Sequence, residues 1–501
     1  MARYKVGFDF GTSSAKIAYR NLDNGQFGLC SFAGKTEKET TICTENGKCL
    51  YGIQPTGNMD VYRYFKMASF IEESYFTLIK DDIERQVGGF ESLYSNTNFL
   101  NHSTGNRISP EFLSSLFICD TAFEVEQSLR SVVKTRFSFF GTADQGSNND
   151  SFSYVFGFPT EFNTNQHLTR LLKMRCILYV AFKLKELYGT WGDFKNAQLE
   201  ELVGYTNEIL DELRISGADF LNNYLSKIGI STYPEAAASL ALIRKTKGLT
   251  ADSYYGSLDI GAGTSDVSLF YITPEYNIRY LASESVAIAA NNLASFYMDA
   301  SDNYSISKFH EQVKQGGLNA LDDGKFEKSL KIFNKLLERS LYKLYNQRAY
   351  KVARRPVMNI FNDQPCVVYG GGSIFIKSQT AFCIHDNFNA SSFNNLTNLL
   401  ASPLLKPHQL AFMGIEEIQE MSDMTIQRLA VAIGLTVTVS EDREYSGLEI
   451  KPSWLMLEDY IDSSGNHIDF IQVPHPTNEG MYISVPADQY YDILNQKFVN
   501  Y

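Results

Sequence analysis

Alternating apolar positions predict two β-hairpins that lie far apart in the chain. In the first, Val6, Phe8 and Phe10 alternate with polar or small residues, residues 11–14 supply a turn, and residues 16–19 resume the extended pattern. The segment SLDIGAGTSDVSLF, residues 257–270, repeats this design. Two such hairpins, one at the start and one near the middle of the chain, predict an internal duplication rather than a short-period repeat array.

The pattern between and after the hairpins predicts a mixed α/β order. Helices are expected over residues 168–188 and 196–228, and a strand over residues 152–158, which ends before Pro159. A later helix carries an apolar stripe at steps of three and four that we expect to pack in the core: Phe326, Leu330, Phe333, Leu337, Leu341 and Leu344. Polar segments rich in Asn, Ser or Gly predict loops at residues 95–105, 141–150 and 387–398.

Length and composition restrict the class of protein. A chain of 501 residues favours two or more domains, and 44% hydrophobic with 20% charged residues is typical of a globular protein. The net charge of -12 argues against partners that are nucleic acids or anionic membranes. Seven scattered cysteines without a CxxC pair predict reduced thiols. With no apolar leader and no apolar run of about 18 residues, we expect a soluble, cytoplasmic protein.

The two hairpin turns carry the residue types that hold phosphates and Mg²⁺. Gly and small hydroxyl residues let backbone N–H groups approach phosphates closely, and carboxylates suit the water shell of Mg²⁺. The candidates are Asp9, Gly11, Thr12, Ser13, Ser14 and Lys16 in the first hairpin, and Asp259, Gly261, Gly263, Thr264, Ser265 and Asp266 in the second. A single strand, Asp and Gly turn of this kind is more often an ordinary hairpin than a binding site. Their pairing indicates a phosphate site.

These residues carry a resemblance to a known superfamily. DFGTSSAKIAY resembles the first phosphate motif of the actin and heat-shock-chaperone superfamily, and LDIGAGTSDVSLF resembles the second, as it stands in the seventy-kilodalton heat-shock chaperones. Other segments follow in the family's order. Residues 232–242 and 428–436 resemble the two connecting helices, VVYGGGS at residues 367–373 resembles the adenosine motif, and residues 156–166 resemble the chaperones' strand and proline turn.

The resemblance implies an α/β fold in which two ribonuclease-H-like (actin-like ATPase) domains flank a central nucleotide cleft. Residues 1–240 with 425–440 would form domain I, residues 241–424 domain II, and residues 441–501 an extension packed on the core. The implied cofactors are ATP/ADP and Mg²⁺. Asp9, Asp259 and Asp266 would organise the metal's water shell, the two turns would hold phosphates, and Gly370, Gly371, Gly372 and Ser373 would pass beside the nucleoside.

The sequence also departs from the family pattern. Chaperones carry a carboxylate before the proline of the first connecting helix, where this chain has Tyr233, and Glu235 follows Pro234. If the segment is aligned with the actin version of this helix instead, the resemblance implies that Glu235 orients the attacking water. Lys16 fits the actin-like and sugar-kinase versions of the first hairpin better than the chaperone version. The chaperones' adenine clamp cannot be placed, and its candidates Lys328, Lys331 and Lys335 are more typical of a solvated helix face.

The implied function is that of a slow ATPase acting as a molecular switch. It would resemble the heat-shock-chaperone ATPases, act through protein partners, and lack a peptide-binding domain, because few residues follow the ATPase core. The alternative is a self-assembling, filament-forming actin-like protein of plasmid segregation or cell shape. A small-molecule kinase is a third hypothesis, without recognisable sugar-binding motifs. No GxxxxGK[ST], HExxH or GxSxG motif occurs, so other common enzyme classes lack their signatures.

Overall fold

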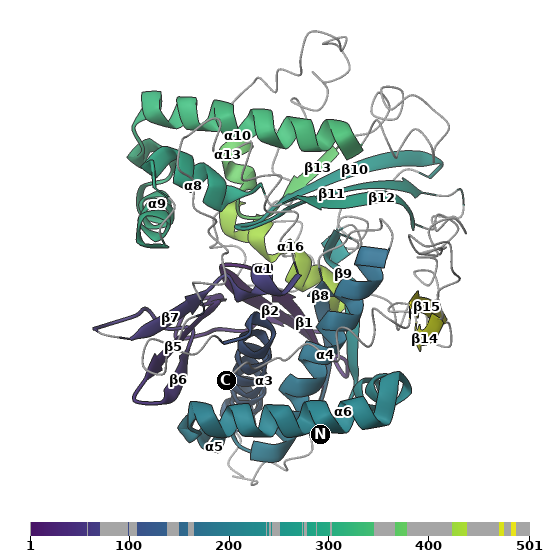
Figure 1. Cartoon of the computed structure of the whole chain (residues 1–501). Coiled ribbons are helices and arrows are strands. Elements are labelled where there is room, and N and C mark those ends of the chain that lie inside the picture. The colour runs from purple at the N-terminus through teal and green to yellow at the C-terminus, as the bar shows by residue number, and fades with distance from the viewer. Residues whose placement is uncertain are drawn as a thin grey trace, which may run out of the picture.

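The computed structural model shows an α/β protein with two separate central sheets (Figure 1). It describes residues 2–57, 59–70, 99, 108–137, 150–158, 165–236, 238–239, 242, 251–272, 274, 278–286, 288–300, 303–344, 366–377, 423–437, 470–474 and 482–486.

The first sheet is built around the N-terminal hairpin. Its strands are β1 (Arg3–Phe10), β2 (Ser14–Asn21), β3 (Phe27–Leu29), β8 (Ser151–Phe158) and β9 (Ile230–Pro234), in the order β3-β2-β1-β8-β9, with β4 (Glu37–Glu39) also paired to β2. β1 is antiparallel to β2 and parallel to β8, which is parallel to β9. The sheet thus begins as a meander and continues through crossover connections.

The second sheet repeats this order. Its strands are β10 (Ser253–Ile260), β11 (Ser265–Ile272), β12 (Ile278–Val286) and β13 (Cys366–Tyr369), in the order β12-β11-β10-β13. β10 is antiparallel to β11 and parallel to β13, as β1 is to β2 and β8. The shared topology confirms both predicted hairpins and supports the internal duplication.

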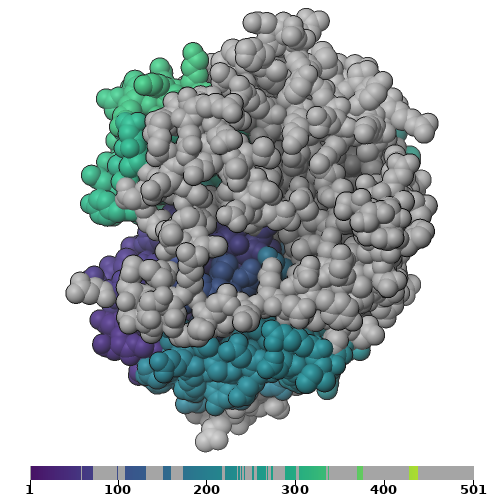
Figure 2. Space-filling model, viewed as in Figure 1, coloured from purple at the N-terminus to yellow at the C-terminus, as the bar shows by residue number. Residues whose placement is uncertain are grey.

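Helices from the first half of the chain cover one face of the first sheet. They are α1 (Phe65–Phe70), α3 (Pro110–Phe137), α4 (Asn165–Tyr188), α5 (Trp191–Asn196) and α6 (Leu199–Lys227). Phe10 stacks on Phe117 of α3 at 5.8 Å between ring centroids, and Tyr154 meets Phe182 of α4 at 5.3 Å. α6 packs on α4 and lies along the surface of the molecule (Figure 2). The predicted helices and strand of this region are confirmed.

A small three-stranded sheet extends from the first half beside the cleft. It consists of β5 (Thr41–Glu45), β6 (Lys48–Tyr51) and β7 (Asp60–Arg63), in the order β6-β5-β7. β7 leads directly into α1. Arg63 at the end of β7 donates a hydrogen bond from Nη1 to Ser307 Oγ, 2.5 Å away on a helix of the second half.

The second sheet carries its own helices, α8 (Ala290–Met298), α9 (Asn303–Gly316), η3 (Leu318–Ala320), α10 (Asp323–Leu344) and α13 (Ser373–Lys377). α10 confirms the predicted amphipathic helix: Phe326, Leu330, Phe333 and Leu337 are buried, whereas Lys328 and Lys331 are exposed. The side chains of Lys335, Leu341 and Leu344 lie outside the described residues.

α16 (Asp423–Val437) lies between the two sheets and contacts β1, β2, β8 and β13 (Figure 1). Small residues allow this close packing. A Cβ at Gly7 would collide with the Ala432 carbonyl, and one at Gly434 would collide with the Ala238 carbonyl. The resemblance to the first connecting helix predicts that the segment containing Ala238 is helical from residue 232. The helix begins three residues later, because residues 232–234 pair with β8 as part of β9.

Near the C-terminus, β14 (Phe470–Pro474) and β15 (Tyr482–Pro486) form a hairpin that contacts α6 and α4, respectively. The predicted loops lie outside the described residues, apart from Phe99 and Asp150. Among the described residues, Cys30, Cys43, Cys49, Cys119 and Cys176 are buried, free thiols. None of the described helices is both long and apolar enough to cross a bilayer.

Candidate functional site

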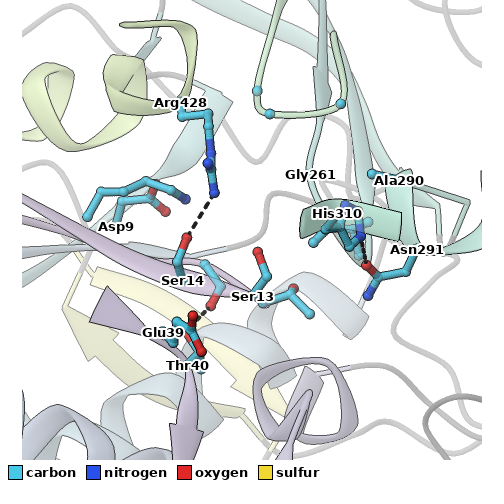
Figure 3. Close-up of a pocket in the computed structure, with 18 of the residues that line it drawn as sticks. Asp9, Ser13, Ser14, Glu39, Thr40, Gly261, Ala290, Asn291, His310 and Arg428 are labelled. Carbon is cyan, nitrogen blue, oxygen red and sulfur yellow. Dashed lines mark hydrogen bonds and ion pairs between the residues drawn. The ribbon is translucent and has the colours of Figure 1, made fainter. Parts of the chain in front are cut away.

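The two hairpin turns face one cleft of about 520 Å³ (Figure 3). Its walls also include the start of α8, part of α9, the turn between β13 and α13, and the middle of α16. Most of the residues predicted from the sequence line it together: Asp9, Gly11, Thr12, Ser13, Ser14, Lys16, Glu235, Asp259, Gly261, Thr264, Asp266, Gly370, Gly371 and Gly372.

Three predicted residues lie behind the cleft surface. Ser265 is buried, and its Oγ donates a hydrogen bond to the Ile288 carbonyl at 2.5 Å. Ser373 is buried at the start of α13. A Cβ at Gly263 would lie 2.8 Å from Thr12 Cγ2 and 2.7 Å from Met67 Cγ. Gly263 therefore marks the place where the two hairpins touch.

The alternation along β1 places Asp9 on the cleft side of its sheet. Phe8 and Phe10 are fully buried, with Phe8 stacked on Phe156 and Phe10 on Phe117. Successive side chains of a strand point to opposite faces, so Asp9 shares the α16 face with Gly7. The alternation that predicts the strand therefore also determines the face on which the Asp9 carboxylate lies.

The two hairpins differ at one equivalent pair of positions. In the first, Asp9 pairs across the strands with Lys16, and Lys16 Nζ lies 3.1 Å from Asp9 Oδ2. In the second, Asp259 occupies the position of Asp9 and pairs with Asp266. Burial, and then the negative charge of Asp266, raise the pKa of Asp259 well above its usual value. The second hairpin thus concentrates negative charge where the first neutralises it.

This acidic pair fits Mg²⁺. Within the described residues, no group of three or more His, Cys, Asp or Glu side chains is placed to hold a metal directly. Mg²⁺ prefers oxygen ligands and usually keeps several of its waters, so it needs only one or two carboxylates. Asp259 and Asp266 supply carboxylate oxygens, and a divalent cation would lower the cost of holding two negative charges together in a buried site.

Neighbouring elements fix the backbone of both turns. Thr40 donates from Oγ1 to the Gly11 carbonyl at 2.8 Å and from its N–H to the Ser13 carbonyl at 3.0 Å. At the second turn, the N–H groups of Ala290 and Asn291 donate to Gly261 and Ala262 at 3.1 and 2.8 Å. Because C=O and N–H point oppositely in a trans peptide, the N–H groups after these carbonyls face away from the bracing segments.

The glycine turn after β13 passes over Asp259. Gly370 has a φ of 86°, which favours glycine, and a Cβ there would collide with Asp259 Oδ1. The Gly372 N–H donates to the Ile260 carbonyl at 2.7 Å, which ties this turn to the second hairpin. The predicted adenosine segment and the second hairpin therefore form one continuous wall.

Glu235 lies at the floor of the cleft in a buried ion pair with Lys66. Lys66 Nζ is 2.8 Å from Glu235 Oε1, and both side chains are about nine-tenths buried. Burial raises the pKa of Glu235; Lys66 opposes the shift and Asp9 adds to it. Lys66 was missed in the sequence. A lysine inside the apolar run YFKMASF, residues 64–70, was the available signal, since lysine is rarely buried without a partner.

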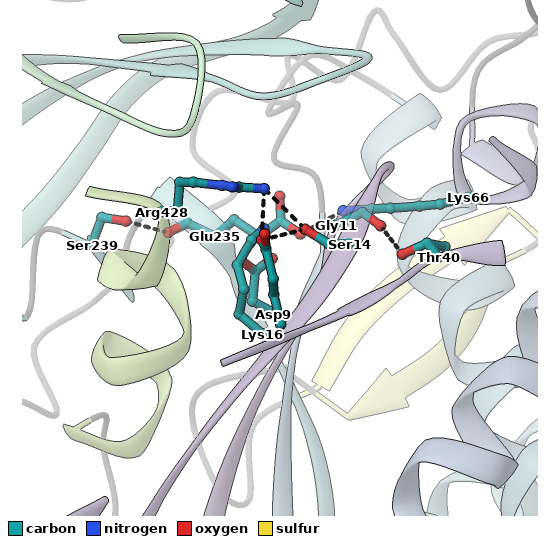
Figure 4. A network of polar contacts seen from close by, with 10 residues as sticks. Asp9, Gly11, Ser14, Lys16, Thr40, Lys66, Glu235, Ser239 and Arg428 are labelled. Carbon is teal, nitrogen blue, oxygen red and sulfur yellow. Dashed lines mark hydrogen bonds and ion pairs between the residues drawn. The ribbon is translucent and has the colours of Figure 1, made fainter. Parts of the chain in front are cut away.

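Arg428 is a second cleft residue that the sequence did not single out. It is the first residue of the second connecting-helix segment, and its guanidinium lies 2.6 Å from Glu37 and 3.3 Å from Ser14 Oγ. Lys314 of α9 approaches the same carboxylate at 3.6 Å. This network ties α16 to the first hairpin (Figure 4). Its sequence signal was a single arginine directly before the apolar stretch LAVAIGL, residues 429–435.

Comparison with known proteins gives little beyond this geometry. No protein-family model matches the chain, and no curated protein matches it. Among solved structures, a chain described as the pCBH ParM non-polymerisable quadruple mutant is similar at 13% identity and a TM-score of 0.34, with 87% of this chain and 98% of that chain covered. The function of this chain is therefore inferred from its own cleft.

Proposed function

We propose that this chain binds ATP with Mg²⁺ between its two hairpins and hydrolyses it slowly. One observation carries the proposal: two hairpins of the same topology bring Asp9 and Lys16, and Asp259 and Asp266, into one cleft at equivalent positions. The turns supply N–H groups for phosphates, Asp259 and Asp266 supply metal ligands, and the glycine turn at residues 370–372 leaves room for a nucleoside.

Each part has a stated chemical role. Mg²⁺, when bound beside Asp9, Asp259 and Asp266, supplies positive charge against the phosphate oxygens. Lys16 shares its charge between Asp9 and a phosphate. Phosphoryl transfer to water needs positioning and charge stabilisation more than covalent work from the protein, so these few groups suffice for slow turnover.

Glu235 is the residue we assign to the attacking water. Lys66 donates a hydrogen bond to Oε1 at 2.8 Å, and we assign Oε2 to accept a proton from that water. A buried carboxyl whose pKa is raised takes up a proton more readily than an exposed one. Lys66 keeps the carboxylate in one orientation and places positive charge near the leaving phosphate.

A direct test measures ATP affinity by calorimetry with Mg²⁺, and phosphate release, on the wild type and three variants. We expect Asp259→Asn to weaken binding more than about tenfold, and Glu235→Gln to bind normally but release phosphate about 100-fold more slowly. The control is Asp211→Asn, which changes an exposed carboxylate on α6. A wild type that ignores ATP, or an Asp259→Asn that binds as well, would refute the proposal.

We further infer a switch between two domains, residues 1–240 with 425–440 and residues 241–424. α16 contacts both sheets, and the helix that begins at Glu235 crosses α16 where Ala238 meets Gly434. These two helices therefore lie where a hinge between the two domains would be. A triphosphate that bridges both hairpins would hold the halves closed, and hydrolysis would release them. Residues 441–501 are assigned to an extension on domain I, supported by the contacts of β14 and β15 with α6 and α4.

Two candidate functions, a chaperone-like switch and a filament-forming protein, differ in what the conformational change would control. The chaperone resemblance rests on the second hairpin and finds no support in the comparisons, so no peptide-binding role is carried forward. A filament-forming actin-like protein remains the alternative. ATP-dependent sedimentation at high protein concentration would establish the filament, whereas a protein that stays monomeric with ATP acts through other protein partners. Sugar-stimulated ADP release would instead indicate a kinase.

A further inference from the structure

Asn291 stands on the cleft wall beside the second hairpin turn. It is the second residue of α8, and its backbone N–H donates to the Ala262 carbonyl at 2.8 Å. Its side chain is fully buried and lines the cleft. An asparagine held against a phosphate turn is placed to meet the part of a ligand that follows the phosphates.

Among the described residues, only one of the two polar atoms of the Asn291 side chain has a hydrogen-bond partner. Its Oδ1 lies 2.8 Å from Nε2 of His310 on α9, which also lines the cleft. Figure 3 shows the amide oxygen turned toward the imidazole and the amide nitrogen turned away from it. Within the described residues, the amide nitrogen Nδ2 of Asn291 has no hydrogen-bond partner. A buried amide donor without a partner is destabilising, so a ligand oxygen placed there would bind favourably.

The imidazole of His310 is neutral at physiological pH. Burial, with the positive charges of Arg428 and Lys314, lowers its pKa to about 4. A neutral imidazole has one N–H and one lone pair. If Nε2–H donates to Asn291 Oδ1, Nδ1 is an acceptor; turning the amide over makes Nδ1 the donor and Oδ1 the acceptor. In both arrangements, the contact between the two side chains leaves one donor and one acceptor of the pair unused, and both residues line the cleft.

We propose that Asn291 and His310 bind the sugar hydroxyls of the nucleotide and discriminate against nucleotides that lack one of these hydroxyls. The inference rests on the proposed function. The sugar is the part of a nucleotide joined directly to the α-phosphate, and Asn291 is bonded to the turn assigned to phosphates. A ribose diol has two groups that each donate and accept, which matches one donor and one acceptor side by side.

The test compares the affinities of ATP, 2′-deoxy-ATP and 3′-deoxy-ATP in the presence of Mg²⁺. We expect wild type to prefer ATP over at least one deoxy analogue by about tenfold, the value of one hydrogen bond. Asn291→Ala and His310→Phe should weaken ATP binding and reduce this preference to within about twofold. The affinity of the variants for that deoxy analogue should hardly differ from that of wild type, because the analogue lacks the hydroxyl that the replaced side chain would bind.

A matched control is Asn292→Ala. Asn292 is also buried on α8, but its Oδ1 accepts from the Ala289 N–H at 2.8 Å and serves the helix itself. This variant should lower the melting temperature and keep the preference for ATP. The ratio of two affinities is insensitive to a loss of folded protein, so a poorly stable variant still reports on the contact.

Other outcomes overturn the inference. If wild type binds ATP and both deoxy analogues equally, or if both variants keep the wild-type preference, the assignment is wrong while the ATP site stands. If the variants lose discrimination between ATP and ITP instead, the pair reads the base edge and not the sugar. If wild type binds none of these nucleotides, the proposed function itself has failed.

Discussion

Lys66 Nζ lies 2.8 Å from Glu235 Oε1 at the floor of the cleft, and both side chains are buried. Lys66 comes from α1, and Glu235 follows β9, 169 residues later. The neighbouring residue Met67 packs against Gly263 of the second hairpin. The short helix α1 therefore joins the proposed water-positioning residue to the contact between the two hairpins.

The first prediction concerns the stability of this ion pair. Lys66→Met or Glu235→Met alone leaves one buried charge without its partner, so we expect each to lower the free energy of unfolding by about 3–5 kcal/mol. The double variant should be much closer to wild type, since it removes both desolvated charges. Urea unfolding of the four proteins measures the coupling; additive losses would contradict it.

Asp259→Asn should stabilise the nucleotide-free protein. Burial and the charges of Asp266, Glu235 and Asp9 raise the pKa of Asp259. A carboxyl with a raised folded-state pKa contributes stability below its unfolded value of 3.8, and this stability is lost as the pH rises through the folded-state pKa. We expect the gain in melting temperature to be larger at about pH 8 than at about pH 5.

The same variant should lose its response to metal. Mg²⁺ should raise the melting temperature of wild type, and EDTA should reverse this, because a bound cation lowers the cost of the crowded carboxylates. Asp259→Asn should show a much smaller effect. Equal stabilisation of both proteins by Mg²⁺ would place the metal elsewhere.

Gly434→Ala tests the crossing of the two helices. A Cβ at Gly434 would meet the Ala238 backbone, which cannot move aside as a side chain can. We expect a loss of at least about 1–3 kcal/mol in the free energy of unfolding. The control is Gly204→Ala on α6, where a Cβ meets nothing within 4 Å, so alanine should stabilise by about 0.5–1 kcal/mol. Similar effects of the two changes would show that the helices do not cross closely.

Glu37 should make the protein sensitive to acid. Burial opposes its ionisation, but Arg428, Lys314, Lys16 and the Ser14 hydroxyl outweigh burial and hold the pKa of Glu37 below its usual 4.5. Its stabilisation is therefore present above pH 4.5 and is lost as the pH falls through the folded-state pKa. Glu37→Gln should be less stable near neutrality and lose less stability on acidification, as measured by urea midpoints. Parallel pH profiles would exclude this role.

Much of the fold and part of the site followed from local sequence. The period of two around Phe8 and Phe10 specified β1 and the direction of Asp9, and the spacing of three and four from Phe326 specified the buried face of α10. Glycines in turns marked where the backbone comes close to other groups. Such features are readable because they depend on residues only a few positions apart.

Tertiary structure decided which distant side chains meet. Arg428 reaches Ser14 across 414 residues, and Lys66 reaches Glu235 across 169. It also turned Ser265 toward the Ile288 carbonyl and placed Asn291 against His310 with one amide atom unpaired. Residue type and spacing fix the face on which a side chain lies, but its partner depends on how the sheets and helices pack, which local periodicity does not encode.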